Sequence, residues 1–294
     1  MFLEKINLNE LTPVQQIDTN FFVKRDDLFM PFEDVPLSGG KVRQCISLIS
    51  NNYDYIKNEC DDNIYTATSV NSPQGIIVSR VAKEFGFKTK LFIYGSRIKE
   101  NNLLMNCLNL GAEINNDCKI GYESALVSLI NKQKEKHFHI KFGINLENNR
   151  ESILDSIAFQ VQNLPKDLDY LIIPCGSCIT MCGILIGLKK YNVNVKNVVG
   201  VQIAGYDRVK TINNYLNNYA LFDDFNYQLR LAKDFPYSKF VSEKIENIDL
   251  DPIYEGKAWY YMQNTMKDEL KNKKVAFWIV GNSSMVRNKI YNGV

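Results

Sequence analysis

Lys41 is the residue of this sequence best placed to do chemistry. In "SGGKVR" it follows a Gly-Gly pair and precedes an apolar stretch. Glycines let the backbone approach a ligand closely. A lysine amine that is desolvated in a pocket becomes a nucleophile able to form a Schiff base. The alternative interpretation is a surface lysine after a loop, which is the commoner use of this residue type.

The stretch "PCGSCITMCG" (174–183) predicts a turn between a buried strand and a helix. Free backbone N–H groups and the positive end of the helix dipole favour a phosphate at such a turn. Ser177 and Thr180 add hydroxyl donors. A plain strand-to-helix connection remains the alternative.

Two further stretches combine polar residues with a predicted helix. In "TSVNSPQGIIVSR" (68–80), Ser72 is either a ligand-binding residue or the N-cap of the helix that follows. In "DPIYEGKA" (251–258), an acid next to a tyrosine is either a proton-transfer pair or a capping arrangement. Each stretch is weak evidence by itself.

The elements that must position these residues alternate between strand and helix. Apolar periodicity predicts strands over 19–28, 62–70, 88–95, 169–176, 195–205 and 273–282, and helices over 41–58, 73–87, 100–114, 151–164, 180–192 and within 251–272. This alternation predicts an α/β chain with two mostly parallel sheet units flanked by helices. Sites in such folds lie at the carboxyl ends of the strands.

Composition narrows the class of protein. The 294 residues suit one large domain or two moderate ones, and 45% hydrophobic with 23% charged residues is typical of a soluble globular enzyme. The net charge of +2 gives no strong attraction to nucleic acid or membrane. Apolar runs are too short to span a bilayer and the N-terminus has no signal-peptide layout, so we expect a cytoplasmic protein. The seven cysteines predict neither a disulfide scaffold nor a completed metal site.

The order of these stretches resembles the fold type II, or tryptophan synthase β-like, enzymes that depend on pyridoxal 5'-phosphate (PLP). The branch it resembles is that of 1-aminocyclopropane-1-carboxylate (ACC) deaminase and D-cysteine desulfhydrase. The similarity rests on "VKRDDL" (23–28), "GGKVRQ" (39–44), "NLGAEI" (109–114), "VVGVQIAG" (198–205) and "YEGKA" (254–258). In this family the stretch similar to "GGKVRQ" carries the Schiff-base lysine.

The resemblance implies a PLP site. Lys41 would bind the cofactor as a Schiff base and later move a substrate proton. Gly176, Ser177, Cys178, Ile179 and Thr180 would hold the cofactor phosphate, and Glu255 would lie near the pyridine nitrogen. An opposite charge there favours the protonated ring.

The resemblance also implies residues on the substrate side. Tyr254 and Tyr237 match active-site tyrosines, and Ser72 and Gln74 match a turn that binds the substrate carboxylate. The chain departs from the family here, because Pro73 replaces the asparagine of that turn and Gly40 stands where the family has asparagine. Asn71 is the candidate replacement as partner of the cofactor's ring hydroxyl.

These observations predict a PLP-dependent lyase or deaminase acting on a small amino acid. The departures leave two alternatives: β-replacement or decarboxylation of an amino-acid group on a larger substrate such as a modified nucleotide, and a non-catalytic PLP-binding protein. By resemblance we expect a homodimer. We also expect a large PLP-binding domain of residues 1–45 and 150–294, a small domain of residues 46–149, and the active site in the cleft between them.

Overall fold

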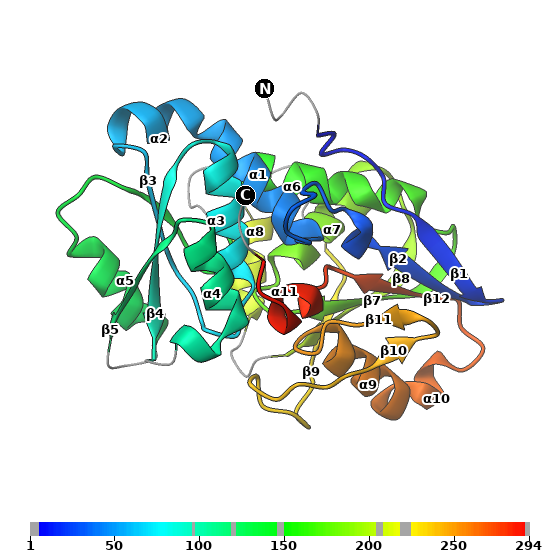
Figure 1. Cartoon of the computed structure of the whole chain (residues 1–294). Helices are drawn as coiled ribbons and strands as arrows, with labels where there is room; N and C mark the ends of the chain where they lie inside the picture. The colour runs from blue at the N-terminus through cyan, green and yellow to red at the C-terminus, as the bar shows by residue number, and fades with distance from the viewer. Residues whose placement is uncertain are drawn as a thin grey trace.

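The computed structural model describes residues 6–95, 98–118, 122–145, 150–203, 208–217 and 225–291. They form two mostly parallel sheets, each flanked by helices (Figure 1). The six-stranded sheet has the order β1 (Val14–Asp18), β2 (Phe21–Arg25), β12 (Val275–Ile279), β7 (Leu168–Cys175), β8 (Val195–Gln202) and β9 (Gln228–Leu231). The β1–β2 pair is antiparallel and the other pairs are parallel.

The central strands β12, β7 and β8 are largely buried, as expected for parallel strands covered by helices on both faces. Leu171 and Ile173 of β7 pack in one cluster with α6, α7 and α8, whereas Ile172 packs on the opposite side with α9. These helices are α6 (Arg150–Ala158), α7 (Ile179–Lys190), α8 (Val209–Leu216) and α9 (Glu255–Thr265). The alternation follows from the two-residue period of a strand.

The four-stranded sheet has the order β5 (Glu113–Cys118), β4 (Lys88–Tyr94), β3 (Asn63–Ala67) and β6 (Phe138–Ile140), all parallel. One face packs with α1 (Gly40–Asn51), α2 (Tyr53–Glu59), α3 (Gln74–Glu84) and α4 (Asn102–Asn109), and the other with α5 (Glu123–Asn131). The predicted α/β class with two flanked, mostly parallel sheets is confirmed.

The boundaries differ from the sequence-based ones in several places. The helix predicted over 41–58 is interrupted at Asn52, the helix over 100–114 gives way to β5, and the helix over 151–164 ends in a 3-10 turn (Phe159–Asn163). The strand predicted over 195–205 ends at Gln202, and positions 204–205 lie outside the described residues. Short elements with weak periodicity were not predicted, among them β1, β9 and α5.

Small elements complete the fold around the ends of the strands. They are the hairpin β10 (Lys244–Ile245) and β11 (Ile248–Asp249), α10 (Lys267–Leu270), and α11 (Ser284–Asn288), which packs on α4 (Figure 1). Within the described part of the chain, every helix is too short or too polar to cross a membrane.

The start of α1 is tied to the end of β12. Gly40 donates its backbone N–H to the carbonyl of Val280 (2.9 Å), and Gly39 donates to the carbonyl of Phe29 (3.0 Å). Gly39 has a φ of 94°, in the region that favours glycine, and a Cβ there would contact the Val280 carbonyl. The Gly-Gly pair therefore lets α1 begin against the neighbouring strand, with Lys41 as its second residue.

Candidate active site

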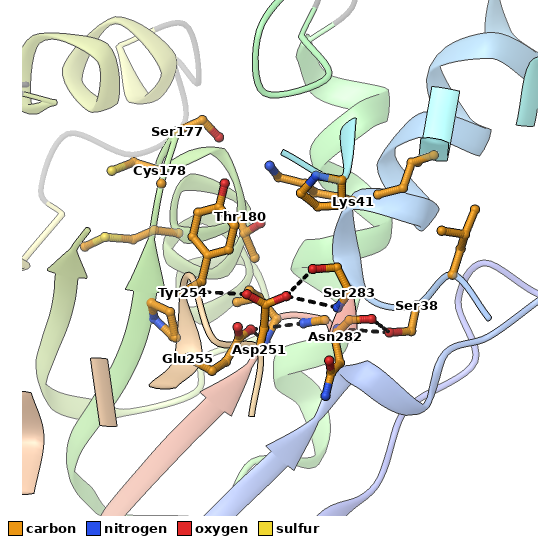
Figure 2. Close-up of a pocket in the computed structure, with 18 residues that line it drawn as sticks. Ser38, Lys41, Ser177, Cys178, Thr180, Asp251, Tyr254, Glu255, Asn282 and Ser283 are labelled. Atoms are coloured by element: carbon orange, nitrogen blue, oxygen red, sulfur yellow. Dashed lines mark hydrogen bonds between the residues drawn. The ribbon is translucent and has the colours of Figure 1, made fainter. Parts of the chain in front are cut away.

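A pocket lies where the carboxyl ends of β7 and β12 meet the starts of α1, α7 and α9 (Figure 2). It encloses about 670 Å³ of space, open solvent at its mouth included. Its lining comprises Leu37, Ser38, Lys41, Pro73, Ile77, Pro174, Gly176, Ser177, Cys178, Thr180, Met181, Asp251, Tyr254, Glu255, Val280, Gly281, Asn282 and Ser283.

Lys41 reaches from α1 into this pocket toward Tyr254 (Figure 2). Its Nζ lies 5.5 Å from the centroid of the Tyr254 ring. Burial lowers the pKa of Lys41 to about 8, although the carboxyl groups of Asp251 and Glu255 act in the opposite direction. About a tenth of the amine is therefore neutral and nucleophilic at pH 7, far more than for an ordinary lysine.

Glu255 is the first residue of α9 and is 1% exposed. Its Oε1 accepts backbone N–H groups from Val280 (3.0 Å) and Gly281 (3.3 Å), while Oε2 is buried without a hydrogen-bond partner. Burial, followed by the nearby Asp251 carboxyl, raises the pKa of Glu255 well above its usual range. A buried, unpartnered carboxyl oxygen in a pocket is suited to a ligand that donates a hydrogen bond or carries a positive charge.

The turn from β7 into α7 forms another wall of the pocket. Cys178 is the N-cap of α7 and has a φ of 66°. The first-turn N–H groups of a helix lack intrahelical partners and favour an anion. Gly176 is required by close packing, because a Cβ there would lie 2.7 Å from Cε1 of Tyr254. Ile179 belongs to the core, so only its backbone can face a phosphate.

The two predicted tyrosines form a pair. Tyr254 lines the pocket, and its hydroxyl lies 2.8 Å from the hydroxyl of Tyr237, which stands outside the lining. Burial raises the pKa of both phenols, that of Tyr254 well above its usual range, so both are protonated at neutral pH. The pair can pass a proton between the pocket and Tyr237.

Asp251 and Ser283 are pocket residues that the sequence did not single out. Asp251 Oδ1 accepts the N–H groups of Ile253 (2.9 Å) and Tyr254 (3.2 Å), and its Oδ2 accepts both the N–H (3.0 Å) and the hydroxyl of Ser283. An Asp-Pro pair before a tyrosine signals a turn. No local sequence pattern indicates the hydrogen bond from Ser283, which lies 32 residues further along the chain. This carboxylate fixes the backbone from which Tyr254 projects (Figure 2).

Asp251→Asn is expected to lower the free energy of unfolding by about 2 kcal/mol. An amide nitrogen would then face hydrogen-bond donors that the carboxylate now accepts. Urea denaturation of the cofactor-free protein measures the change. Asp249→Asn is the matched control: its side chain is 66% exposed in an ion pair with Lys244, so a change within about 0.5 kcal/mol is expected. Equal effects of the two substitutions would contradict the buried role of Asp251.

Lys257 was also missed, although it lies in the quoted "YEGKA" stretch. It is fully buried, and its Nζ donates to the carbonyls of Pro236 (2.9 Å) and Tyr237 (2.8 Å). Burial lowers its pKa to about 8. Lys257 thus holds the segment that carries Tyr237.

The turn before α3 lines the pocket with other residues than the sequence predicted. Pro73 and Ile77 line the pocket, whereas Ser72, Gln74 and Asn71 do not. The Ser72 hydroxyl accepts the N–H of Gln74 (3.2 Å), but the N-cap of α3 is Pro73, so Ser72 precedes the cap position predicted for it. The roles predicted for these three residues stay predictions.

Gln74 and Asn71 lie outside the lining of the Lys41 pocket. The Gln74 amide donates to Thr66 Oγ1 (2.9 Å) and accepts the N–H of Gly143 (2.8 Å), so it ties β3 to a neighbouring loop. Asn71 lines a separate groove described below.

Comparison with known proteins defines the class. Residues 4–218 match the family described as pyridoxal-phosphate dependent enzyme, and the chain belongs to that family. The protein is therefore a PLP-dependent enzyme, as the sequence predicted.

Relatives within this family have differing activities. The chain is 26% identical to the O-seryl-dTMP PLP-dependent decarboxylase of Salmonella phage ViI, over 97% of this chain and 83% of that protein. It is 25% identical to the mitochondrial bifunctional D-cysteine desulfhydrase/1-aminocyclopropane-1-carboxylate deaminase of Arabidopsis thaliana, over 88% and 71% of the two chains. The crystal structure of an ACC deaminase homologue superposes with a TM-score of 0.75 at 21% identity, covering 94% of this chain and 91% of that chain.

The residues of the pocket fit PLP. An amine of lowered pKa, a turn with free helix-terminal amides and an orphaned buried carboxyl oxygen line one pocket. These groups suit an aldehyde, a phosphate and a protonated ring nitrogen respectively.

The pKa of Lys41 predicts how cofactor uptake depends on pH. Only the neutral amine attacks an aldehyde, so the rate at which the cofactor-free protein binds PLP should rise with pH and level off above about pH 8. Stopped-flow absorbance at a series of pH values measures this. A rate that continues to rise toward pH 10.5, the ordinary pKa of lysine, would contradict the buried environment of Lys41.

Proposed function

We propose that the protein is a PLP-dependent lyase that releases ammonia from a small amino acid, with the cofactor bound covalently through Lys41. The observation that carries this proposal is that Lys41 and the buried carboxyl of Glu255 line the same pocket. PLP supplies an electron sink for bonds at the α-carbon of an amino acid.

The chain's own residues would bind and orient the cofactor. Lys41 would hold the aldehyde carbon, and the amides and hydroxyls of the turn at 176–180 would bind the phosphate. Glu255 would hold a proton at the ring nitrogen through Oε2, because its Oε1 is already fixed by Val280 and Gly281. Two backbone hydrogen bonds orient the carboxyl without help from the ligand.

Lys41 and the tyrosine pair would move protons. Lys41 lies in the pocket with a pKa lowered to about 8, so its free amine would be suited to take a proton from the substrate near neutral pH. Tyr254 would donate its phenolic proton and recover one from Tyr237 across 2.8 Å. Burial of Glu255, which is 1% exposed, would limit the access of water to its end of the pocket.

A second candidate function is decarboxylation of an amino-acid group attached to a nucleotide. There the bond between the α-carbon and the carboxylate breaks, CO2 leaves, and the α-carbon takes up a proton. A wide groove beside the pocket favours it, as does the name of the phage relative.

The arrangement of the two sheets supports the proposed domain division and site. The six-stranded sheet is built from residues 14–25 and 168–279, and the four-stranded one from residues 63–140. We propose a large domain of residues 1–45 and 150–294 and a small one of residues 46–149, with the active site between them. A cytoplasmic homodimer is proposed by family resemblance alone.

Product analysis separates the two candidates. The PLP-loaded protein is incubated with ACC, both enantiomers of cysteine and serine, and a serine linked through its oxygen to deoxythymidine monophosphate. Ammonia and a 2-oxo acid from a free amino acid would support the deaminase. CO2 from the nucleotide conjugate alone would support the decarboxylase. A loaded protein that releases neither product from any of them would contradict both candidates and leave the non-catalytic alternative.

A further inference from the structure

A second, wider groove opens beside the Lys41 pocket. It encloses about 2370 Å³ of space, mouth included, against about 670 Å³ for the pocket. Ser38 and Asn282 line both. These two residues are joined by hydrogen bonds from Asn282 N to Ser38 Oγ (3.0 Å) and from Ser38 Oγ to the Asn282 carbonyl (3.3 Å). Ser38 and Asn282 therefore separate the pocket from the groove, and a molecule that occupied both would pass beside them (Figure 2).

Several large apolar side chains that line the groove are exposed to solvent. Leu28, Met30, Phe240 and Met285 line it and are each about half exposed, at 47%, 50%, 53% and 55%. Scattered single apolar residues are ordinary on a surface, but a group around one concavity marks a binding site. A flat apolar body, such as a ring, would cover this surface.

A guanidinium stands beside this apolar surface. Arg287 of α11 lies 5.7 Å from the centroid of the Phe240 ring. It donates to Ser283 Oγ (2.8 Å) and to the carbonyl of Asn71 (2.6 Å), so it is held in place at the groove wall. Lys289 lies two residues further along the chain and also lines the groove. Aromatic and cationic side chains together bind a base and a phosphate.

The charged side chains that line the groove favour a ligand with one phosphate over a polyanion. The groove is also lined by Asp27, Glu100, Glu243 and Asp249. Arg25 is paired with Asp27 at 2.8 Å, and Lys244 with Asp249 at 2.8 Å. The acids and cations roughly balance, so the field does not favour a polyanion such as a nucleic-acid strand. One phosphate near Arg287 and Lys289 is compatible with that balance.

We propose that this groove binds the nucleoside monophosphate part of a substrate whose amino-acid part enters the Lys41 pocket. The inference rests on the second candidate function above and names the residues that would make it specific. The base lies on Phe240 and Met285, and the phosphate lies near Arg287 and Lys289. A free mononucleotide conjugate is the ligand class.

The test is equilibrium binding of deoxythymidine monophosphate and of thymidine to the PLP-loaded protein by titration calorimetry. Phe240→Ala should weaken binding of both about tenfold, by loss of stacking. Lys289→Ala should weaken only the monophosphate, several-fold. Tyr122→Ala is the matched control, since Tyr122 is a 69% exposed aromatic residue away from the groove, and it should change neither.

Each other outcome overturns the proposal in a distinct way. No binding of the monophosphate, or binding that Phe240→Ala leaves unchanged, would remove the groove as its site. Tighter binding of a single-stranded oligonucleotide than of the monophosphate would show that the ligand of the groove is a nucleic-acid strand and not a mononucleotide. A change of oligomeric state in Phe240→Ala, measured by light scattering with unchanged affinity, would make the groove a contact between two copies. The absorbance of bound PLP is recorded in every titration, so failure of the cofactor site is recognised separately from failure of the groove.

Discussion

Replacing Lys41 by alanine is expected to lower turnover by roughly 10²–10⁴-fold and to remove the covalent link to the cofactor. Three described lysines have a pKa lowered by burial: Lys24 to about 7, and Lys41 and Lys257 each to about 8. Only Lys41 lines the pocket with Glu255. Lys24 donates to the Thr12 carbonyl and to Asn163, both at 2.7 Å, and is part of the structural framework.

Lys257→Met is the matched control for this substitution. Lys257 has the same lowered pKa as Lys41, but its amine is bonded to two carbonyls outside the pocket lining. We expect that variant to be less stable, yet to retain the absorbance of covalently bound PLP. Thermal unfolding and absorbance of both variants make the comparison. Unchanged turnover in Lys41→Ala, in a variant shown to be folded, would contradict the proposed mechanism.

Glu255→Gln is expected to reduce turnover by about 10²-fold while leaving the cofactor attached. Glutamine keeps an oxygen that can accept the N–H groups of Val280 and Gly281, so the fold around α9 is preserved. What is lost is the carboxyl oxygen Oε2 that would hold a proton at the ring nitrogen. The expected signature is a fall in kcat with little change in cofactor affinity.

Glu269→Gln provides the control for loss of a glutamate carboxylate. Glu269 is paired with Arg230, which donates to it at 2.8 Å, and lies far from the pocket lining. Its replacement should leave turnover unchanged. Equal turnover in Glu255→Gln and the unaltered protein would show that the ring nitrogen does not depend on this carboxyl.

The fold class was accessible from sequence because long periodic segments dominate it. The strand at 169–176 and the helix at 180–192 lie within one residue or two of β7 and α7. The helix predicted over 41–58 was wrong at Asn52, where the chain leaves the helical conformation and restarts as α2. Local apolar periodicity continues across such a break and does not reveal it.

Part of the candidate site could be predicted from the sequence because several of its residues lie in short motifs. Lys41, Tyr254, Glu255 and the turn at 176–180 lie in short motifs, and the structure brings them to one pocket. Their roles in binding and catalysis stay predictions. Gln74 shows the limit of motif reasoning, because its amide bonds with Thr66 and Gly143 are tertiary contacts without a local signal.

The groove was inaccessible from sequence for the same physical reason. Its walls come from segments as distant as Leu28, Asn101, Phe240 and Arg287. Of these residues only Leu28 stands in a motif that the sequence singled out, "VKRDDL" (23–28), and that stretch gives no sign of a groove. The packing of α11 against α4, for example, brings Arg287 near Asn101 and Asn102 although about 185 residues separate them in the chain.

The central claim is that PLP is bound covalently by Lys41. The most direct test is to reduce the purified, PLP-loaded protein with borohydride, digest it and locate the added phosphopyridoxyl mass by mass spectrometry. The mechanism predicts a yellow protein whose absorbance band is lost on reduction, with the mass on the peptide that contains Lys41. Attachment at Lys24 or Lys257, or a protein that takes up no PLP, would contradict it.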